Sequence, residues 1–123
     1  MFDKKILIVD DEIDIREPFS DYLSLKGFKN ILCAGNPSEA LAIIEKQKPD
    51  LILLDIQLKD AINGIEILKR TKEKLSPDSK VIMVSGHREE YEEGAYQLGA
   101  YDFWKKPIMP NQIMEGVAKA LST

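Results

Sequence analysis

The sequence is poor in the residues that form covalent cross-links and soft-metal sites. It has one cysteine, Cys33, and one histidine, His87, among 123 residues. A lone cysteine excludes an internal disulfide and suits a reducing compartment such as the cytoplasm. We expect Cys33 to be buried as a small hydrophobic residue. Because no second histidine or cysteine lies near it in the sequence, His87 is interpreted as a surface loop residue rather than a metal ligand.

Long apolar runs and long basic runs are also missing. The pure apolar runs have about four residues, far below the roughly 20 that a membrane helix needs, and the stretch Met1–Lys5 does not resemble a signal peptide. Lysine and arginine number 17 against 21 acidic residues, a net charge of −4, which argues against binding to nucleic-acid phosphates. No repeat or linker divides the chain, so we expect residues 1–123 to form one cytoplasmic domain without membrane or direct nucleic-acid contacts.

Short apolar segments alternate with longer helical segments along the chain. Three unalternating apolar runs predict central strands of a parallel sheet covered on both faces; they are Ile6–Val9, Leu51–Leu54 and Val81–Val84. Two more mixed runs, Ile31–Ala34 and Tyr101–Trp104, predict edge strands. Helical segments of about 10–15 residues lie between the strands, and five such βα units predict an α/β fold with an open, doubly wound sheet.

Local signals mark where several helices begin and end. The segment Asn36–Glu39 offers an N-cap asparagine, a proline at the first helical position and a glutamate three residues after the cap. Gly27 and Gly99 fit helix ends that require a positive φ. Pro18 conflicts with the pattern because it lies about two turns inside the first helix. We therefore predict either a kink near Glu17 or a late start of that helix.

Acidic side chains follow two of the predicted central strands. Asp10 and Asp11 come directly after the first strand, and Asp55 comes after the third. Because the carboxyl ends of parallel strands meet at one edge of the sheet, these like charges raise one another's pKa unless a cation offsets them. Carboxylate oxygens favour a hard divalent ion, so the pattern predicts a Mg²⁺ site. A competing interpretation, in which Asp10 and Asp11 only cap the following helix, leaves Asp55 unexplained.

Polar residues also end the last two strands, since Ser85 follows the fourth and Lys106 the fifth. Taken in this order and spacing, four segments resemble the response-regulator receiver domain of two-component signalling; they are Ile6–Glu12, Leu51–Asp55, Val81–Gly86 and Gly99–Pro107. The resemblance covers essentially the whole chain. It implies a flavodoxin-like three-layer sandwich, in which a five-stranded parallel sheet of order 2-1-3-4-5 is flanked by five helices.

The resemblance implies a role for each matching residue. Asp55 matches the phosphoacceptor, which takes a phosphoryl group from the phosphohistidine of a sensor histidine kinase or a histidine phosphotransfer protein. The family's Mg²⁺ ligands match Asp10, Asp11, Asp55 and the Gln57 backbone carbonyl, and its lysine that contacts the phosphoryl group matches Lys106. Ser85 and Phe103 match the two switch residues. Gln57 and His87 match the positions that control the lifetime of the phosphoryl group. The family also implies a cis peptide at Lys106–Pro107.

The same resemblance implies a signalling module rather than an enzyme, although one that promotes its own aspartyl phosphorylation and dephosphorylation. Phosphorylation would change the surface formed by helix 4, strand 5 and helix 5, which would then bind a partner or a second copy of the chain. Two departures from the family pattern stand out. Lys59 occupies the usual place of a proline, in a loop one residue longer than usual, and Phe103 replaces the commoner tyrosine and lacks its hydroxyl.

Two other functions compete with the receiver. A degenerate receiver that binds partners constitutively is disfavoured by the retained acids, Ser85 and Lys106. A small nucleotide-binding enzyme on the same fold would have a Ser/Thr/Gly-rich phosphate loop after the first strand, where this chain has acids. The sequence fits both a stand-alone receiver and the receiver of a longer regulator, which could be a DNA-binding one.

Overall fold

Five parallel strands form the central sheet of the computed structural model, which describes residues 1–59 and 62–122. The strands are β1 (Lys5–Val9), β2 (Asn30–Ala34), β3 (Leu51–Asp55), β4 (Lys80–Ser85) and β5 (Asp102–Lys105). Their order across the sheet is β2-β1-β3-β4-β5, which confirms the expected topology. Strands β1, β3 and β4 occupy the centre, where both faces are covered, and this is why their apolar residues do not alternate with polar ones.

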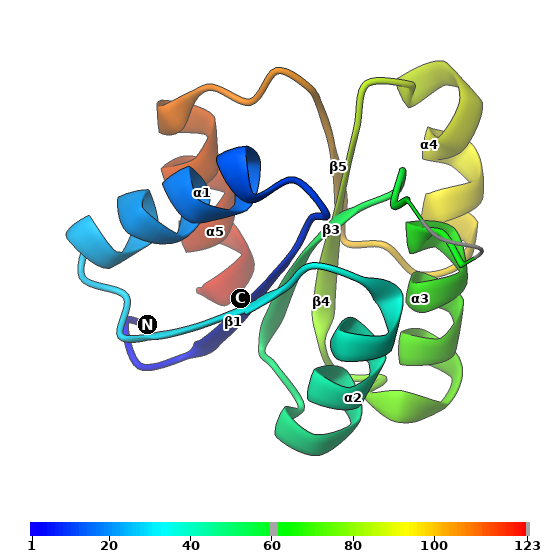
Figure 1. Ribbon diagram of the computed structural model, residues 1–123, viewed down its shortest axis with the longest axis horizontal. Helices are drawn as coiled ribbons and strands as arrows, with labels where there is room; N and C mark the ends of the chain where they lie inside the picture. Colours follow the sequence, from blue (N-terminus) through cyan, green and yellow to red (C-terminus); the bar gives the residue numbers. More distant parts are fainter. Residues whose placement is uncertain (60–61, 123) are drawn as a thin grey trace.

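Five helices cover the two faces of the sheet and complete the predicted three-layer sandwich. They are α1 (Ile13–Leu25), α2 (Pro37–Gln47), α3 (Gly64–Arg70), α4 (Arg88–Gln97) and α5 (Pro110–Leu121), and a π-helical turn, η1 (Thr71–Leu75), extends α3. Helices α1 and α5 pack on one face and α2, α3 and α4 on the other (Figure 1). None of the described helices combines the length and the apolar character that crossing a bilayer requires.

The predicted helix ends are confirmed where the structure tests them. The Asn36 side chain accepts a hydrogen bond of 2.9 Å from the backbone N–H of Glu39, and Pro37 is the first helical residue of α2. Gly27 and Gly99 have φ values of 106° and 101°, a region that favours glycine because it has no Cβ. The peptide bond between Lys106 and Pro107 is cis.

Two expectations require correction. Helix α1 begins at Ile13 and continues through Pro18, so the predicted late start is wrong, while the kink near Glu17 stays a prediction. Cys33 is exposed rather than buried. It lies on β2, an edge strand whose only partner in the sheet is β1, and an edge strand is covered less completely than a central one.

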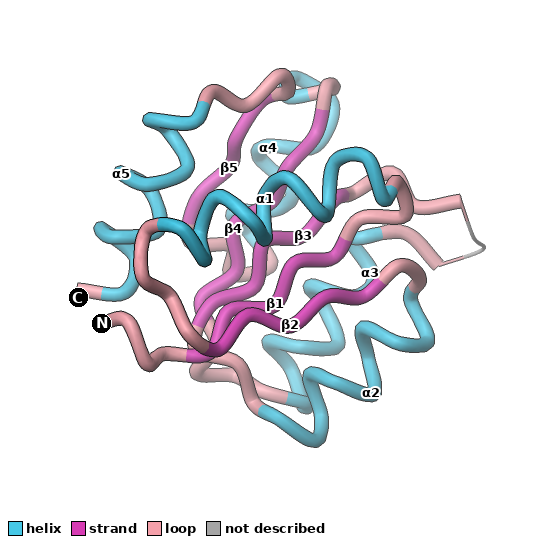
Figure 2. Tube along the Cα trace, turned by 60° about the vertical axis from the view of Figure 1, so that its left-hand side comes forward, coloured by secondary structure: helices cyan, strands magenta, loops and turns pink. Residues whose placement is uncertain are grey.

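The register of the sheet brings the acidic residues to one level. Val9 of β1 pairs with Leu54 of β3, so Asp10 and Asp55, the residues that follow, leave the sheet side by side. Figure 2 shows β1 between β2 and β3. We call the end of the sheet where the strands finish, at Val9, Ala34, Asp55, Ser85 and Lys105, the carboxyl edge, and the opposite end the amino edge.

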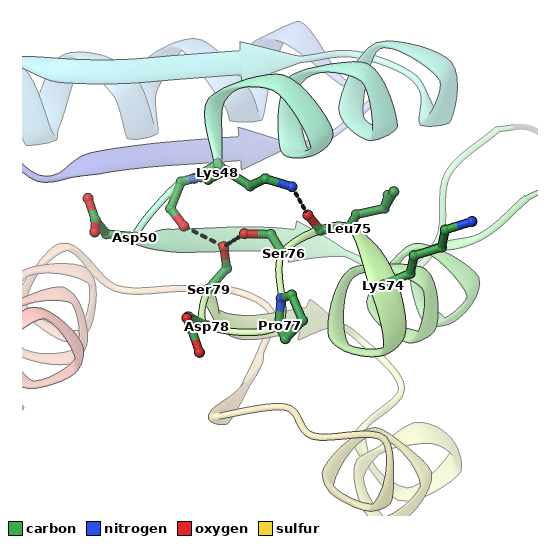
Figure 3. A pocket seen from close by; sticks show the side chains of 9 residues that line it. Lys48, Asp50, Lys74, Leu75, Ser76, Pro77, Asp78 and Ser79 are labelled. Carbon is green, nitrogen blue, oxygen red and sulfur yellow. Dashed lines mark hydrogen bonds between the residues drawn. The ribbon is translucent and has the colours of Figure 1, made fainter.

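Hydrogen bonds between two loops, residues 48–50 and 76–79, close the amino edge (Figure 3). The Ser79 hydroxyl donates to the backbone carbonyl of Pro49 and lies 2.6 Å from the Ser76 hydroxyl. The Lys48 ammonium donates to the carbonyl of Leu75, the last residue of η1. Ser76 and Ser79 are both buried, and their hydroxyl groups are satisfied within the protein, as buried polar groups require.

Candidate functional site

Three carboxylates and one ammonium group meet at the carboxyl edge. Carboxylate oxygens of Asp10, Asp11 and Asp55 lie within 4.8 Å of one another. The Lys106 Nζ atom lies 3.5 Å from Asp10 Oδ2 and 3.5 Å from Asp55 Oδ2. The side chains of Asp10 and Asp55 are only 6% and 5% exposed, whereas that of Lys106 is 26% exposed. The Lys106 ammonium therefore lies between two nearly buried carboxylates, those of Asp10 and Asp55, and the Asp11 carboxylate lies at the rim.

The carboxylates carry an electrostatic penalty for this arrangement. Burial, together with the nearby charge of Asp10, raises the pKa of Asp55 to about 6, against the lowering effects of Lys106 and the Gln57 N–H. Burial also raises the pKa of Asp10, against the lowering effects of the Glu12 N–H and Lys106. Negative charge at this site is thus incompletely compensated by the protein itself, and a bound cation would relieve the deficit.

Backbone N–H groups hold the three carboxylates in place. Glu12 N donates to Asp10 Oδ1 at 2.9 Å, Lys59 N to Asp11 Oδ2 at 2.9 Å and Gln57 N to Asp55 Oδ1 at 3.3 Å. The N-cap of α1 is Glu12, and its side chain makes no capping hydrogen bond. Asp10 and Asp11 therefore do not cap α1, which removes the competing interpretation of this pair. Each carboxylate keeps oxygen capacity for a further ligand.

Ser85 and Phe103 lie on the adjacent strands β4 and β5. Ser85 is fully buried, its hydroxyl accepts a 3.0 Å hydrogen bond from His87 N, and its carbonyl accepts one of 2.9 Å from Lys106 N. The last bond ties the backbone of Lys106 to the end of β4. The Phe103 side chain is 1% exposed and packs in the core on the side of α4. The aromatic side chain thus already occupies an inward position in this structure.

The remaining predicted residues lie at the rim. Gln57 and His87 are exposed and belong to the loops after β3 and β4. The structure therefore brings the loops that carry them to the edge where the acids meet, and both residues are exposed there whereas Ser85 is buried. The unusual loop after Asp55 includes residues 60 and 61, which lie outside the described residues, so the effect of its extra length stays a prediction.

Two contacts at this edge were not predicted from the sequence. Lys59, noted only as a departure from the family pattern, contributes its backbone N–H to Asp11. Arg16 of α1 donates from Nη1 to the backbone carbonyl of Asp10 at 2.6 Å. The sequence did contain an indication of the Arg16 contact. A positive charge in the first turn of a helix is disfavoured by the helix dipole, so a nearby acceptor for its side chain is expected. A backbone N–H contact such as that of Lys59 leaves no signal in the residue type.

The donor set fits Mg²⁺. Three carboxylates that converge within 4.8 Å offer only oxygen ligands, which is the preference of a hard cation that keeps several waters. The charge of Asp10, which adds to burial in raising the pKa of Asp55, supports the same conclusion, because an added positive charge would offset it. Among the described residues, this cluster alone combines three acidic, histidine or cysteine side chains close enough to share one ion.

Comparison with known proteins shows the family. Residues 6–118 match the response regulator receiver domain. The chain belongs to this family. Sporulation initiation phosphotransferase F of Bacillus subtilis is 35% identical to it, over 98% of this chain and 96% of that protein. The phosphate regulon transcriptional regulatory protein PhoB of Pseudomonas aeruginosa is 40% identical over 93% of this chain, which spans only 50% of that regulator.

The fold agrees with that of solved receivers. The crystal structure of a CheY-like response regulator receiver domain protein from Methanospirillum hungatei matches with a TM-score of 0.91 and 33% identity, covering 98% of this chain and 94% of that one. The chain is thus a receiver domain of the kind found in two-component response regulators, a CheY-like phosphoacceptor module of a signalling protein. Receiver domains in general bind Mg²⁺ in an acidic pocket and interact with histidine kinases or phosphotransfer proteins.

Proposed function

We propose that Asp55 is the phosphoacceptor of this receiver, that Asp10, Asp11, Asp55 and the backbone carbonyl of Gln57 bind Mg²⁺, and that Lys106 contacts the transferred phosphoryl group. The observation that carries this proposal is the position of the Lys106 ammonium, 3.5 Å from both Asp10 and Asp55 in a cluster of three carboxylates. We further propose that residues 1–123 act as one such domain in the cytoplasm.

The reaction follows from these positions. The Asp55 carboxylate attacks the phosphorus of a phosphohistidine, a P–O bond forms, the P–N bond breaks, and the departing imidazole takes up a proton. Because its pKa is about 6, Asp55 is mostly ionised and nucleophilic above neutral pH. The Lys106 ammonium offsets the charge of the incoming phosphoryl oxygens. When bound, Mg²⁺ supplies further positive charge against those oxygens.

The switch couples this chemistry to a surface. We propose that the Ser85 hydroxyl, which now accepts a hydrogen bond from His87 N, donates to the phosphoryl group on Asp55 and thereby shifts the loop after β4. A change in the position of the Phe103 side chain would then alter the surface formed by α4, β5 and α5. Arg88 ties α4 to β5, because its Nη2 donates to the Phe103 carbonyl at 2.9 Å. This is the surface proposed for a partner protein or for a second copy of the chain.

The phosphodonor is proposed to be a sensor histidine kinase or a histidine phosphotransfer protein. Its histidine must approach Asp55 from the open end of the sheet. A mainly apolar groove of about 470 Å³ lies beside Lys106, lined by Asp14, Ile15, Pro18, Phe19, Lys106, Pro107 and Ile108. The groove shares Lys106 with the acidic site, so it offers the donor protein apolar area next to one of the reacting groups.

Intact mass after incubation with acetyl phosphate tests the proposed phosphoacceptor. The wild-type protein is expected to gain one phosphoryl group in the presence of Mg²⁺ and none in the presence of a chelator, and Asp55→Ala is expected to gain none. Asp78→Ala removes an exposed aspartate between Pro77 and Ser79 at the amino edge, and it should behave like wild type. Absence of any gain in the folded wild-type protein would favour the constitutive interaction module instead.

We also propose that Gln57 and His87 set the lifetime of the aspartyl phosphate, because their loops flank the approach of water to Asp55. Replacing either exposed side chain by alanine should change the rate of dephosphorylation about two-fold to ten-fold, less than the roughly 10²- to 10⁴-fold effect of a general acid or base, because each side chain would only help to position one water. The loss of phosphoryl mass over time measures this rate. If Gln57→Ala and His87→Ala both decay at the wild-type rate, neither side chain has this role.

A further inference from the structure

Arg16 occupies an electrostatically unfavourable place in the fold. It lies in the first turns of α1, where the helix dipole disfavours a positive charge. Its side chain is half-buried. In the described part of the chain, no carboxylate lies within ion-pair distance of its guanidinium group. Such a cation requires a compensating contact, and the structure provides a single short one.

That contact is made to the peptide that joins two acids of the site. Arg16 Nη1 donates to the carbonyl oxygen of Asp10 at 2.6 Å, a short distance of the kind expected when the donor is charged. The carbonyl belongs to the peptide plane between Asp10 and Asp11. On the other side of Asp10, its N–H donates to the Ala34 carbonyl at 3.2 Å. The main chain is therefore held before and after Asp10, by β2 and by Arg16.

Gly35, which follows β2, makes room for this contact. A Cβ atom at Gly35 would lie only 2.8 Å from Arg16 Nη1, closer than van der Waals contact allows. The backbone itself does not require glycine there, because the described glycines with positive φ are Gly27 and Gly99. The loop that carries Gly35 is in turn fixed to α2, since Gly35 N donates to Glu39 Oε1 at 3.0 Å.

We propose that Arg16 is a positioning residue of the receiver, which orients the Asp10–Asp11 peptide and thereby the two carboxylates that hold Mg²⁺, and that Gly35 is glycine in order to admit its guanidinium group. This inference rests on the proposed function of the acidic site. The guanidinium bonds to a backbone carbonyl and forms no ion pair with the described carboxylates, so it holds the main chain in place and leaves the carboxylate oxygens available to the metal. Groups that orient metal ligands in this way contribute substantially to metal affinity.

Calorimetric titration of the whole 123-residue protein with MgCl₂ tests the inference. Arg16→Gln is expected to weaken Mg²⁺ binding about ten-fold, as loss of groups behind metal ligands commonly does. Arg16→Lys should recover part of the affinity, because an ammonium group can still donate to one carbonyl. Gly35→Ala should weaken binding in the same direction by displacing the guanidinium. Arg70→Gln, which removes an exposed arginine of α3, serves as the matched control and should bind Mg²⁺ like wild type.

The combination of variants separates positioning from general destabilisation. Because Gly35→Ala acts through Arg16, the double variant Arg16→Gln/Gly35→Ala should bind Mg²⁺ no more weakly than Arg16→Gln alone, and additive losses would overturn the inference. With acetyl phosphate as donor, the Mg²⁺ concentration at half-maximal rate should rise by the same factor as the dissociation constant, while the rate at saturating Mg²⁺ changes less. A uniform loss of rate at every concentration would contradict this.

The titration also distinguishes failure of the inference from failure of the proposed function. Wild-type protein that binds Mg²⁺, together with folded Arg16→Gln of unchanged affinity, would overturn the role of Arg16 alone. Wild-type protein that binds no Mg²⁺ would overturn the proposed metal site and the inference with it. Thermal unfolding in the presence of a chelator establishes that each variant is folded before its affinity is interpreted.

Discussion

The two edges of the same sheet satisfy their buried polar groups in opposite ways. At the amino edge, the hydroxyl groups of Ser76 and Ser79 pair with each other and with a backbone carbonyl. At the carboxyl edge, Asp10 and Asp55 share one lysine, and burial raises the pKa of both acids. The buried side chains of the amino edge are uncharged and bonded within the protein, whereas the buried side chains of the carboxyl edge keep an excess of negative charge. Elsewhere in the fold, packing and hydrogen bonding both favour the folded state. Uncompensated buried charge is the exception, and such exceptions are expected where a protein binds a ligand.

This contrast shows which edge is available for chemistry. Helix α2 ends at the amino edge with a lysine at its C-cap, and that lysine donates to a carbonyl of η1, a favourable placement of charge near helix C-termini. At the carboxyl edge, the charged groups oppose one another and leave ligand positions open. The polar bonds that only stabilise the fold and the charged groups of the candidate site therefore lie at opposite ends of the strands, about one strand length apart.

The largest effect on stability is expected from removing the charge of Asp55. Its pKa is about 6 in the folded protein against 3.8 as the unperturbed value, so the folded state binds the proton more tightly than the unfolded state. The contribution of Asp55 to folding stability is therefore fully present below about pH 4, is lost as the pH rises through about 6, and stays lost above that. Without Mg²⁺ at pH 7.5, Asp55→Asn should be more stable than wild type by roughly 2–3 kcal/mol, as measured by urea unfolding.

The same experiment has an internal check. The difference in unfolding free energy between Asp55→Asn and wild type should shrink towards zero as the pH falls from 6 to 4, because both proteins then carry a neutral side chain at position 55. Added Mg²⁺ should stabilise wild type more than the variant, because only the folded wild-type site retains all three carboxylates. A variant less stable than wild type at pH 7.5 would show that the carboxyl edge is not strained by its charges.

A smaller effect of opposite sign is expected at the amino edge. Ser79→Ala leaves the Pro49 carbonyl and the Ser76 hydroxyl without their buried partner, and an unpaired buried polar group costs about 1–3 kcal/mol. We expect Ser79→Ala to lose about 2 kcal/mol of unfolding free energy, with the same loss at pH 5 and pH 8 because no charge is involved. Its Mg²⁺ affinity and its phosphorylation by acetyl phosphate should equal those of wild type.

Ser24→Ala provides the matched control for this variant, because Ser24 is exposed on α1 and a surface substitution of this kind changes stability by about 0.5 kcal/mol at most. Two results would break the comparison between the edges. One is a loss of stability in Ser79→Ala no larger than that in Ser24→Ala. The other is weakened Mg²⁺ binding in Ser79→Ala, which would mean that the two edges are coupled through the strands.

Most of the fold and the acidic cluster could be predicted from the sequence, because both depend on short-range patterns. Unalternating apolar runs predict central strands, and an acid directly after such a run must lie at the carboxyl edge whatever the exact register. The cap at Asn36 and the glycine at position 27 depend only on neighbouring residues. These signals remain valid because tertiary packing reinforces them rather than overriding them.

The contacts that escaped prediction depend on where side chains reach in three dimensions. The bond from Arg16 to the Asp10 carbonyl requires the space left by Gly35, in the loop after β2. The run Ile31–Ala34 predicts an edge strand but not which of its side chains is left uncovered, and Cys33 is one of the exposed residues of β2. The π-helical turn Thr71–Leu75 arises where the Ser76 N–H bonds to the Thr71 carbonyl at 2.9 Å. The types of these residues do not determine that this N–H bonds to the carbonyl five residues earlier rather than to the one four residues earlier.

The smallest effect is expected at an ion pair outside both edges. Arg70 Nε lies 3.2 Å from Glu66 Oε2 on α3, closer than Lys106 lies to Asp55, but its two side chains are 47% and 42% exposed. Solvent screens such a pair, so Arg70→Gln should lower the unfolding free energy by only about 0.3–0.5 kcal/mol at low salt, and by less in 0.5 M NaCl. Urea unfolding at the two salt concentrations measures both values. A loss above about 1 kcal/mol would mean that distance, rather than burial, decides the strength of ion pairs in this protein, and the contrast between its two edges would then need a different explanation.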